Sequence, residues 1–416
     1  MSKSGQNVND IKTANRSLLL NLLYFDGAQS RKTLAAKSNL TAAAVTLIIN
    51  ELILDGCVIE TDKTVSTGKS GRKERLVDIN YESIYFLGVS IGTETFEVRL
   101  AGLSGKPTGM KTYSIDKNDI SSLWQAVAAA CNDMLNLLTI EDAKVGGIGV
   151  TVKGIVDNSN GVSINSYGTL QNNCRIAGEL SSFIDLPITI ENNVRAMLIA
   201  DSIVRQAKPV QSTLFIRYGP GIGGALLIGH KCYSGSNNRA IELGHICVEE
   251  NGEQCLCGKK GCLETVISFE AIQRKILFSF SNEDTPVLYK LVQGYQEAIS
   301  MEIVLDAYES GDPGVVMIID SAIKLFALSV SNFASLLDPH TVLLSSSVFA
   351  NSAVVNKLQN EIRAHSNSNA PRYLLSKTTQ RLETYGAISV AINRFLIDGG
   401  QELKRTNLTN RRTSNE

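Results

Sequence analysis

The segment ELGHICVEENGEQCLCGKKGCLE, residues 242–264, holds His245, Cys255, Cys257 and Cys262 within eighteen residues. The whole chain has only 4 His and 8 Cys, so four unconnected loop residues are the weaker interpretation. Zn²⁺ takes four N or S ligands tetrahedrally, and thiolates favour it over Mg²⁺ or Ca²⁺. Gly258 and Gly261 supply tight turns that let three sulfur atoms converge. The spacing predicts a closed, structural zinc site made by His245, Cys255, Cys257 and Cys262.

Two glutamates, Glu242 and Glu264, begin and end this segment, and metal binding does not require either of them. Carboxylates held by a rigid metal loop are good acceptors for sugar hydroxyl groups. The alternative is that both are solvated surface residues. Their chemistry alone leaves the two interpretations open.

The order E-L-G-H and then C-L-C-G-x-x-G-C-L-E resembles the signature of the ROK family of repressors, open reading frames and kinases. The likeness covers the spacing of every expected metal ligand and of both glutamates. In that family the His and three Cys bind zinc, and the His and two Glu line a sugar pocket. The resemblance implies that Glu242, His245 and Glu264 face a sugar.

Composition and charge favour a cytoplasmic protein of two or three domains. The 416 residues carry a net charge of −1. Residues 1–80 hold 11 Lys and Arg against 8 Asp and Glu, a net charge of +3, whereas the remaining residues sum to −4. The polar N-terminus lacks the apolar core of a signal peptide, and we expect no membrane span. No disulfide spacing appears outside the cluster, which fits a reducing compartment.

Three helices are predicted in the first 55 residues. Leucines at helical spacing mark the first helix over 10–25. Ser30 is placed to cap a second helix over 31–37, and Thr41 to cap a third that ends near Asp55.

The third predicted helix has two different faces. Val45, Ile48, Ile49 and Leu52 fall at i, i+3, i+4 and i+7, so one face is expected to be buried. The outer face is small and polar and can approach a DNA groove. The expected DNA contacts on this helix are Thr41, Ala42, Ala43, Thr46 and Asn50.

A basic hairpin is predicted to follow. Strand-like stretches at 57–60 and 75–79 flank a Ser/Thr/Gly/Lys loop. A basic tip can neutralise phosphates, and an Arg beside Gly can enter a narrow minor groove. Residues 1–80 therefore resemble the winged helix-turn-helix of NagC/XylR-type ROK repressors. Those repressors often carry Gly-Arg-Pro in the wing, and this chain keeps the Arg but not the Pro. The alternative is a plain helical cap that does not bind nucleic acid. The tip of this predicted wing carries Lys69, Arg72, Lys73 and Arg75, and the expected DNA contacts among them are Lys69, Arg72 and Lys73.

The body, residues 84–400, alternates strands, hairpins and helices, which predicts an α/β class. The resemblance implies the two-lobed actin-like, ribonuclease H-like sugar-kinase fold, with a ligand between the lobes. The polar tail at 401–416 is expected to be disordered. The expected elements are strands at 85–93, 97–103, 145–150, 187–190 and 341–344, helices at 120–138, from 193, 289–308, 314–337 and 385–397, and a Gly-rich hairpin at 214–228.

The resemblance also raises the question of kinase activity. Kinases of the family carry an Asp in the first strand turn, where this chain has Ser90, and a catalytic Asp where it has Asn193. Asn cannot accept a proton from a sugar hydroxyl at neutral pH, although its amide still hydrogen-bonds one. The phosphate-side hairpin keeps its glycines at 219–224, whereas 345–347 is Ser-Ser-Ser instead of a Gly-rich turn. We therefore expect no enzymatic activity.

These patterns predict a sugar-responsive transcriptional repressor that binds operator DNA. Its effector is a sugar or sugar phosphate contacted by Asn192, Asn193, Glu242, His245 and Glu264. One small head covers one half-site, so a homodimer or a dimer of dimers is expected. The alternatives are an active ATP-dependent sugar kinase and a repressor governed by a protein partner instead of a sugar.

Overall fold

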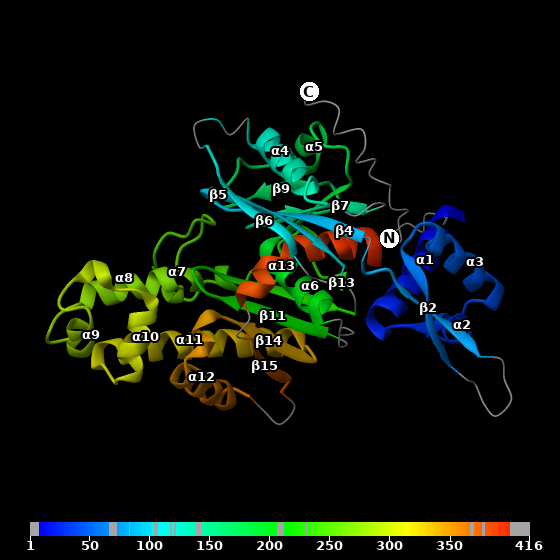
Figure 1. Ribbon diagram of the computed structural model, residues 1–416. Helices are drawn as coiled ribbons and strands as arrows, with labels where there is room; N and C mark the ends of the chain where they lie inside the picture. Colours follow the sequence, from blue (N-terminus) through cyan, green and yellow to red (C-terminus); the bar gives the residue numbers. More distant parts are fainter. Residues whose placement is uncertain are drawn as a thin grey trace. The chain divides into compact units, whose positions relative to one another are not determined.

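The computed structural model describes residues 8–65, 73–82, 84–103, 107–116, 119, 122–138, 143–205, 212–229, 231–366, 370–376 and 379–399. The chain divides into two compact units (Figure 1). The first unit comprises Met1–Lys208 and Glu383–Glu416, and the second comprises Pro209–Leu382. The chain therefore leaves the first unit once and returns to it near its C-terminus. The tail at 401–416 lies outside the described residues.

The three predicted head helices are present as α1 (Val8–Asp26), α2 (Arg31–Ser38) and α3 (Ala42–Leu54). Ser30 Oγ caps α2 by accepting from the amide of Thr33, 3.1 Å away, and Thr41 Oγ1 caps α3 by accepting from Ala44, 3.2 Å away. The turn between them is closed by Asn39 in the left-handed conformation, with φ 57°. These local signals, readable in the sequence, set the two helices at an angle of 117°.

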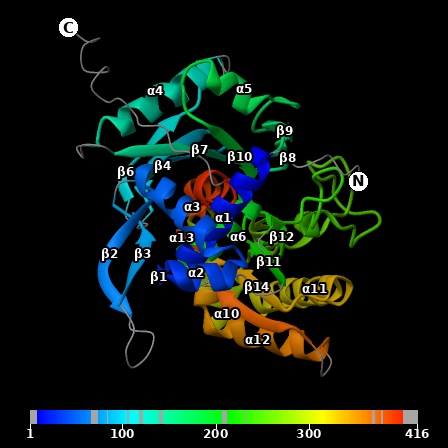
Figure 2. The ribbon, with the colours of Figure 1, turned by 90° about the vertical axis from the view of Figure 1, so that its right-hand side faces the viewer.

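A three-stranded antiparallel sheet completes the head, in the order β1 (Gln29–Ser30), β3 (Glu74–Ile79), β2 (Val58–Val65). The β2–β3 pair forms the expected wing and extends away from the helices (Figure 2). The helices and sheet enclose Leu23, Ile49, Leu52 and Val77, which are all fully buried. The head thus has the three helices and the β-hairpin that the winged helix-turn-helix prediction requires.

The sheet of the first unit has the strand order β10-β7-β4-β5-β6. Strands β4, β5 and β6 form an antiparallel meander, and β7 and β10 then add in parallel to β4. Helices α4 (Leu123–Leu135), α5 (Ile176–Ser181) and α6 (Asn193–Arg205) belong to the same unit. The strands are β4 (Ile84–Ile91), β5 (Thr95–Gly102), β6 (Pro107–Ser114), β7 (Lys144–Val152) and β10 (Ile188–Asn192), and β8 (Ile155–Asp157) pairs with β9 (Val162–Asn165) beside it.

The sheet of the second unit repeats this topology. Its order is β13-β12-β11-β14-β15, with an antiparallel meander of β11, β12 and β13 followed by two parallel strands. The duplication expected of a ribonuclease H-like, two-lobed protein is therefore visible in the strand order. The strands are β11 (Ser212–Tyr218), β12 (Ile222–Ile228), β13 (Lys231–Cys232), β14 (Thr341–Ser345) and β15 (Arg372–Ser376).

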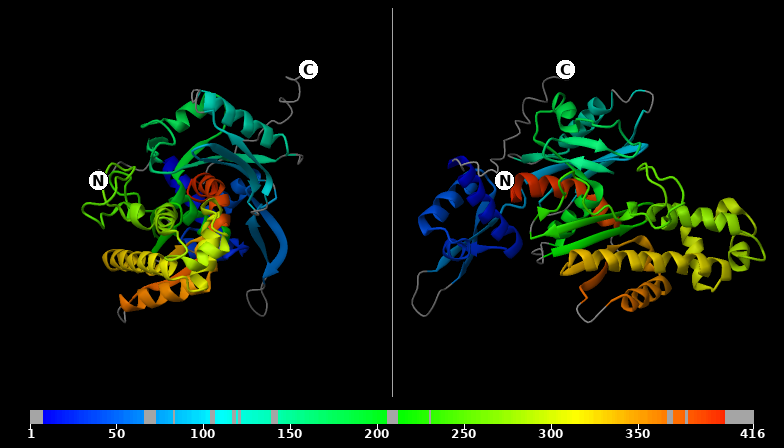
Figure 3. Two further views of the ribbon diagram at one scale, coloured as in Figure 1. Left: turned by 90° about the vertical axis from the view of Figure 1, so that its left-hand side faces the viewer. Right: turned by 180° about the vertical axis from the view of Figure 1, so that it is seen from behind.

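One long helix predicted in the second unit is not continuous in the structure. The segment 289–308 is interrupted, because Gln293 and Gly294 adopt positive φ of 53° and 80° and end the helical path. Helices α7, α8, α10 and α12 contact the long α11, and α9 contacts α10 (Figure 3). The elements are α7 (Leu263–Ile267), α8 (Phe269–Ser279), α9 (Pro286–Leu291), α10 (Met301–Glu309), α11 (Pro313–Leu337) and α12 (Ser352–Ala364).

Helix α11 is long and apolar enough, by length and composition alone, to cross a membrane, which the sequence expectation overlooked. Of its most apolar window, 56% is buried inside the chain, where Ile319, Ile323 and Phe326 join the core of the second unit. The bent helix pair α2–α3, if taken as one segment, is also long and apolar enough to cross a membrane. A buried core helix of a globular domain meets the same criterion, so this is weak evidence for a span.

The closing helix returns the chain to the first unit, as α13 (Thr379–Ala391) and a π-helical turn at Ile392–Ile397. It lies directly on the sheet: a Cβ added at Gly149 of β7 would sit 1.9 Å from the Ala387 carbonyl oxygen. Its end packs against the head, where the Ile397 carbonyl accepts from Ser17 Oγ at 2.7 Å and Asn21 Nδ2 at 2.9 Å. One apolar cluster therefore joins head, sheet and closing helix.

Candidate functional site

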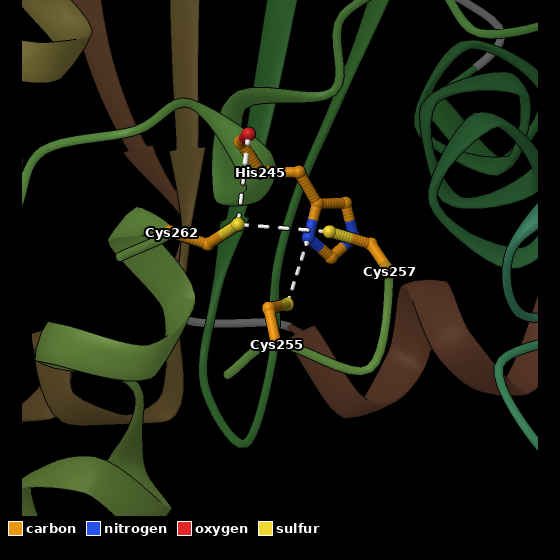
Figure 4. Close-up of side chains that lie close together, drawn as sticks. All are labelled: His245, Cys255, Cys257 and Cys262. Atoms are coloured by element: carbon orange, nitrogen blue, oxygen red, sulfur yellow. Dashed lines mark hydrogen bonds between the residues drawn. The ribbon is translucent and has the colours of Figure 1, made fainter. Parts of the chain in front are cut away.

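The four expected metal ligands converge (Figure 4). Their ligand atoms all lie within 4.8 Å of one another. Cys257 Sγ is 3.6 Å from Cys262 Sγ, and Cys255 Sγ is 3.5 Å from His245 Nδ1. A tetrahedral metal with bonds of about 2.3 Å to sulfur places its sulfur ligands roughly 3.8 Å apart, so the cluster fits such an ion.

The loop that carries these ligands is held by main-chain contacts. The amide of Cys255 donates to the Lys259 carbonyl at 2.8 Å, and Val248 donates to the Gly261 carbonyl at 2.8 Å. Gly261 has φ +63°, and a Cβ there would lie 1.6 Å from the Glu249 carbonyl oxygen, so no other residue fits. Burial, together with the neighbouring thiols, raises the pKa of Cys262 to about 12, so its thiolate is disfavoured unless a cation lies close to it.

The two glutamates contact the loop differently. Glu242 Oε2 lies 3.7 Å from His245 Nε2, the nitrogen opposite the one that faces the cysteines. A carboxylate at this position orients a metal-binding imidazole. Glu264 Oε2 accepts from the amide of Ile222 at 2.7 Å and therefore fixes the Gly-rich hairpin between β11 and β12.

The other two expected sugar ligands belong to the first unit, at the carboxyl end of β10. Both polar atoms of the Asn192 amide are engaged: Oδ1 accepts from Val194 and Arg195 main-chain amides at 2.9 and 3.1 Å, and Nδ2 donates to the Gly154 carbonyl at 2.7 Å. Asn192 therefore caps α6. The amide of Asn193, by contrast, has no hydrogen-bond partner among the described residues and can bind a hydroxyl group.

A buried ion pair that the sequence analysis missed supports these asparagines. Glu191 Oε1 and Arg195 Nε are 2.6 Å apart, and both side chains are 5% exposed. Glu191 also accepts from Asn158 Nδ2 at 2.9 Å, and Arg195 Nη2 donates to the Val156 carbonyl at 2.9 Å. The i,i+4 spacing across a strand end and a helix start was its only signal in the sequence.

The positions expected to carry phosphate-side chemistry hold hydroxyl groups. Ser90 Oγ, near the end of β4, accepts a hydrogen bond from Thr151 Oγ1 of β7 at 3.2 Å. In the second unit, Ser346 is fully buried and its Oγ caps the turn after β14 by accepting from Val348 N at 3.3 Å. These serines are therefore used for packing and capping.

The residues predicted to contact DNA on α3 and at its N-cap, Thr41, Ala42, Ala43, Thr46 and Asn50, are exposed, and Lys73 is exposed beside β3. Leu47, which the sequence analysis left out, is 64% exposed on the same face. Lys69 and Arg72 lie outside the described residues. Arg75 is not at the wing tip: it forms an ion pair of 2.9 Å with Glu60 across the strands, which an argument from sequence could not anticipate.

Comparison with known proteins places this geometry in a family. The model of the ROK family matches residues 86–393. The DNA-binding transcriptional dual regulator NagC of Escherichia coli K12 is 24% identical over 364 residues, which cover 84% of this chain and 85% of NagC. A crystal structure of a ROK family transcriptional regulator, a homologue of the E. coli MLC protein, superposes with a TM-score of 0.78 at 23% identity, over 94% of this chain and 97% of that one.

A sugar kinase is also similar, over a shorter part of the chain. The glucokinase of Thermotoga maritima is 27% identical over 263 residues, which cover 63% of this chain and 81% of the enzyme. Relatives of both kinds therefore share the body, and the regulator structure also extends over the head. From the family match over residues 86–393, this chain belongs to the ROK family.

Proposed function

We propose that this protein is a sugar-responsive transcriptional repressor. Its head binds operator DNA, and its body binds a sugar or sugar phosphate. The observation that carries the proposal is the combination of an exposed α3 with a body that keeps hydroxyl-binding groups where a kinase needs a carboxylate base. The similarity to NagC, a DNA-binding regulator, supports the same function.

We propose sugar contacts from Asn193, whose amide has no hydrogen-bond partner among the described residues, and from polar side chains of the metal loop. Asn193 contributes its amide from the first unit, and Asn192 holds it there by capping α6. Glu242 and His245 are the proposed contacts from the metal loop, and Glu264 fixes the adjacent hairpin through one carboxylate oxygen. A zinc ion bound by His245, Cys255, Cys257 and Cys262 would give this loop its rigidity, and it leaves no ligand position for a reactive water.

Catalysis is not part of the proposal. A general base typically contributes about 10²- to 10⁴-fold to a rate, and Asn193 supplies none. Ser90 supplies no carboxylate either, because its side chain is a hydroxyl group, and that hydroxyl accepts a hydrogen bond from Thr151. We further propose a cytoplasmic homodimer or dimer of dimers, because one head reads one half-site.

The test begins with operator fragments selected from genomic DNA by the full chain. Candidate sugars and sugar phosphates are then titrated against the complex, and one of them is expected to change operator affinity and to raise the melting midpoint. If operator is bound but no sugar has either effect, control by a protein partner replaces control by a sugar. ATP-dependent phosphorylation of a sugar at turnover numbers typical of kinases would show that the protein is an enzyme.

A further inference from the structure

A further cysteine lies beside the metal cluster without belonging to it. Cys247 is exposed, and its sulfur is not among the four ligand atoms that converge. It forms an isolated antiparallel β-bridge with Cys262, one of the expected metal ligands. Among the β-register pairs of the described residues, this is the only one that sets two cysteines opposite each other.

The main-chain hydrogen bonds around this bridge show which type of antiparallel pair it is. The amide of Val248 donates to the Gly261 carbonyl at 2.8 Å, and the amide of Leu263 donates to the Ile246 carbonyl at 2.9 Å. These bonds flank the two cysteines, which therefore form a non-hydrogen-bonded pair. Cα atoms in such a pair are about 4.5 Å apart, which falls within the roughly 4.4–6.8 Å that a disulfide spans.

The two sulfur atoms point to different partners. Cys262 Sγ turns into the cluster, 3.6 Å from Cys257 Sγ, whereas Cys247 Sγ contacts the Glu249 carbonyl at 3.6 Å. Side chains of directly opposed residues leave an antiparallel ladder on the same side. Rotation of the Cys247 side chain about its Cα–Cβ bond is therefore the movement that brings its sulfur toward Cys262.

Exposure separates the roles of these cysteines. Cys247 is exposed, whereas Cys255 and Cys262 are buried and Cys257 is half-buried. A dissolved oxidant therefore reaches the Cys247 sulfur first. A sulfenic acid formed on an accessible cysteine condenses with a nearby thiol to a disulfide, and Cys262 is the cysteine that lies opposite.

We propose that Cys247 and Cys262 form an oxidative modification site, at which a peroxide links them as a disulfide and removes one ligand from the metal cluster. The Cys247 thiol attacks the O–O bond of hydrogen peroxide, becomes a sulfenic acid and releases water. The Cys262 thiolate then attacks the Cys247 sulfur, the S–S bond forms and hydroxide leaves. The two sulfur atoms together lose two electrons, and the peroxide gains them. The inference rests on the proposed zinc site.

The modification removes a quarter of the ligand set. His245, Cys255 and Cys257 remain, whereas a structural zinc site needs four ligands, so we expect the loop to lose the ion. The loop that carries Glu242 then loses its rigid support. In a reducing compartment such a disulfide is transient, because a dithiol reverses it by exchange.

The test exposes the full zinc-loaded chain to excess hydrogen peroxide. A chromogenic zinc chelator follows metal release, and mass spectrometry of alkylated, proteolysed samples identifies the linked peptides. We expect one zinc ion released for each Cys247–Cys262 link, and dithiothreitol with added zinc is expected to restore the thiols and the bound metal. Cys247→Ser is expected to hold as much zinc before treatment and to release it roughly tenfold more slowly.

Cys232→Ser is the matched control, because Cys232 is a half-buried cysteine on β13 and is not one of the four converging ligands. It is expected to release zinc as fast as the unaltered chain. Release from Cys247→Ser at the unaltered rate would overturn the inference, as would peptides that link Cys257 to Cys262 instead of Cys247. A chain that holds no zinc before treatment would refute the metal site, and the linked peptides would still decide the pairing.

Discussion

The ammonium group of Lys144, at the start of β7, donates a hydrogen bond to the main-chain carbonyl of Asp55, the C-cap residue of α3. Lys144 is only 7% exposed, and a cation at this end of a helix also stabilises the helix dipole. Beyond the other end of β7, the Gly154 carbonyl accepts from Asn192. A single strand therefore links the C-terminus of α3 to the residue that caps α6.

This contact predicts that Lys144→Met weakens the attachment of the head. A buried hydrogen bond from a charged group is worth about 1.5–3 kcal/mol, and we expect the free energy of unfolding to fall by that amount. Operator affinity is expected to fall with it, while metal content stays unchanged. Urea denaturation and a DNA-binding titration measure both. Lys324→Met, at an exposed position of α11, is the control, and an equal loss there would contradict the role given to Lys144.

The metal loop predicts one zinc per chain. Cys257→Ser is expected to lower the zinc content and the melting midpoint, because a structural zinc site contributes its binding free energy to folding. Cys247→Ser is the matched control, since Cys247 is exposed, lies between His245 and Cys255 in the sequence and is not among the four converging ligands. Metal analysis of the purified chains decides the matter: full zinc content in Cys257→Ser would remove this residue from the site.

The adjacent asparagines are expected to behave differently. Asn192→Ala removes an N-cap and the bond to Gly154, so we expect the free energy of unfolding to fall by about 1–2 kcal/mol. Asn193→Ala removes an amide without protein partners among the described residues, so stability should change little while sugar affinity falls. Calorimetric titration with the effector sugar and urea denaturation separate the two effects. Unchanged sugar affinity in Asn193→Ala would exclude it from the binding site.

The contact between Gly149 and α13 predicts a steric limit. Gly149→Ala places a methyl group against the Ala387 carbonyl, and relief of that clash is expected to cost about 1–3 kcal/mol or more. Gly178→Ala, in α5, has only Arg175 Cβ nearby at 3.9 Å and is expected to raise stability by roughly 0.5–1 kcal/mol. Thermal unfolding of both variants measures the two changes in stability, which are expected to have opposite signs. A stable Gly149→Ala would mean that α13 does not pack closely on β7.

Much of the protein is determined by short-range sequence patterns. The caps Ser30 and Thr41, the apolar spacing of α3 and the metal loop between His245 and Cys262 each lie within about twenty residues, and the structure contains all of them. Residues close in sequence have few possible arrangements, so helix propensity, capping and ligand spacing are sufficient to predict these features. The sequence alone also shows Asn193 at the position where kinases of the family have a catalytic Asp.

Tertiary structure decided which polar groups remain for ligands and how the head is held. Arg75 was assigned to phosphates from its charge, yet Glu60 binds it, and Asn192 was assigned to sugar, yet its amide caps α6. Lys144 and Asp55 are 89 residues apart, and Ser17 reaches the Ile397 carbonyl across 380 residues. Which partner satisfies a buried donor depends on how distant strands and helices pack, and no local pattern encodes that choice.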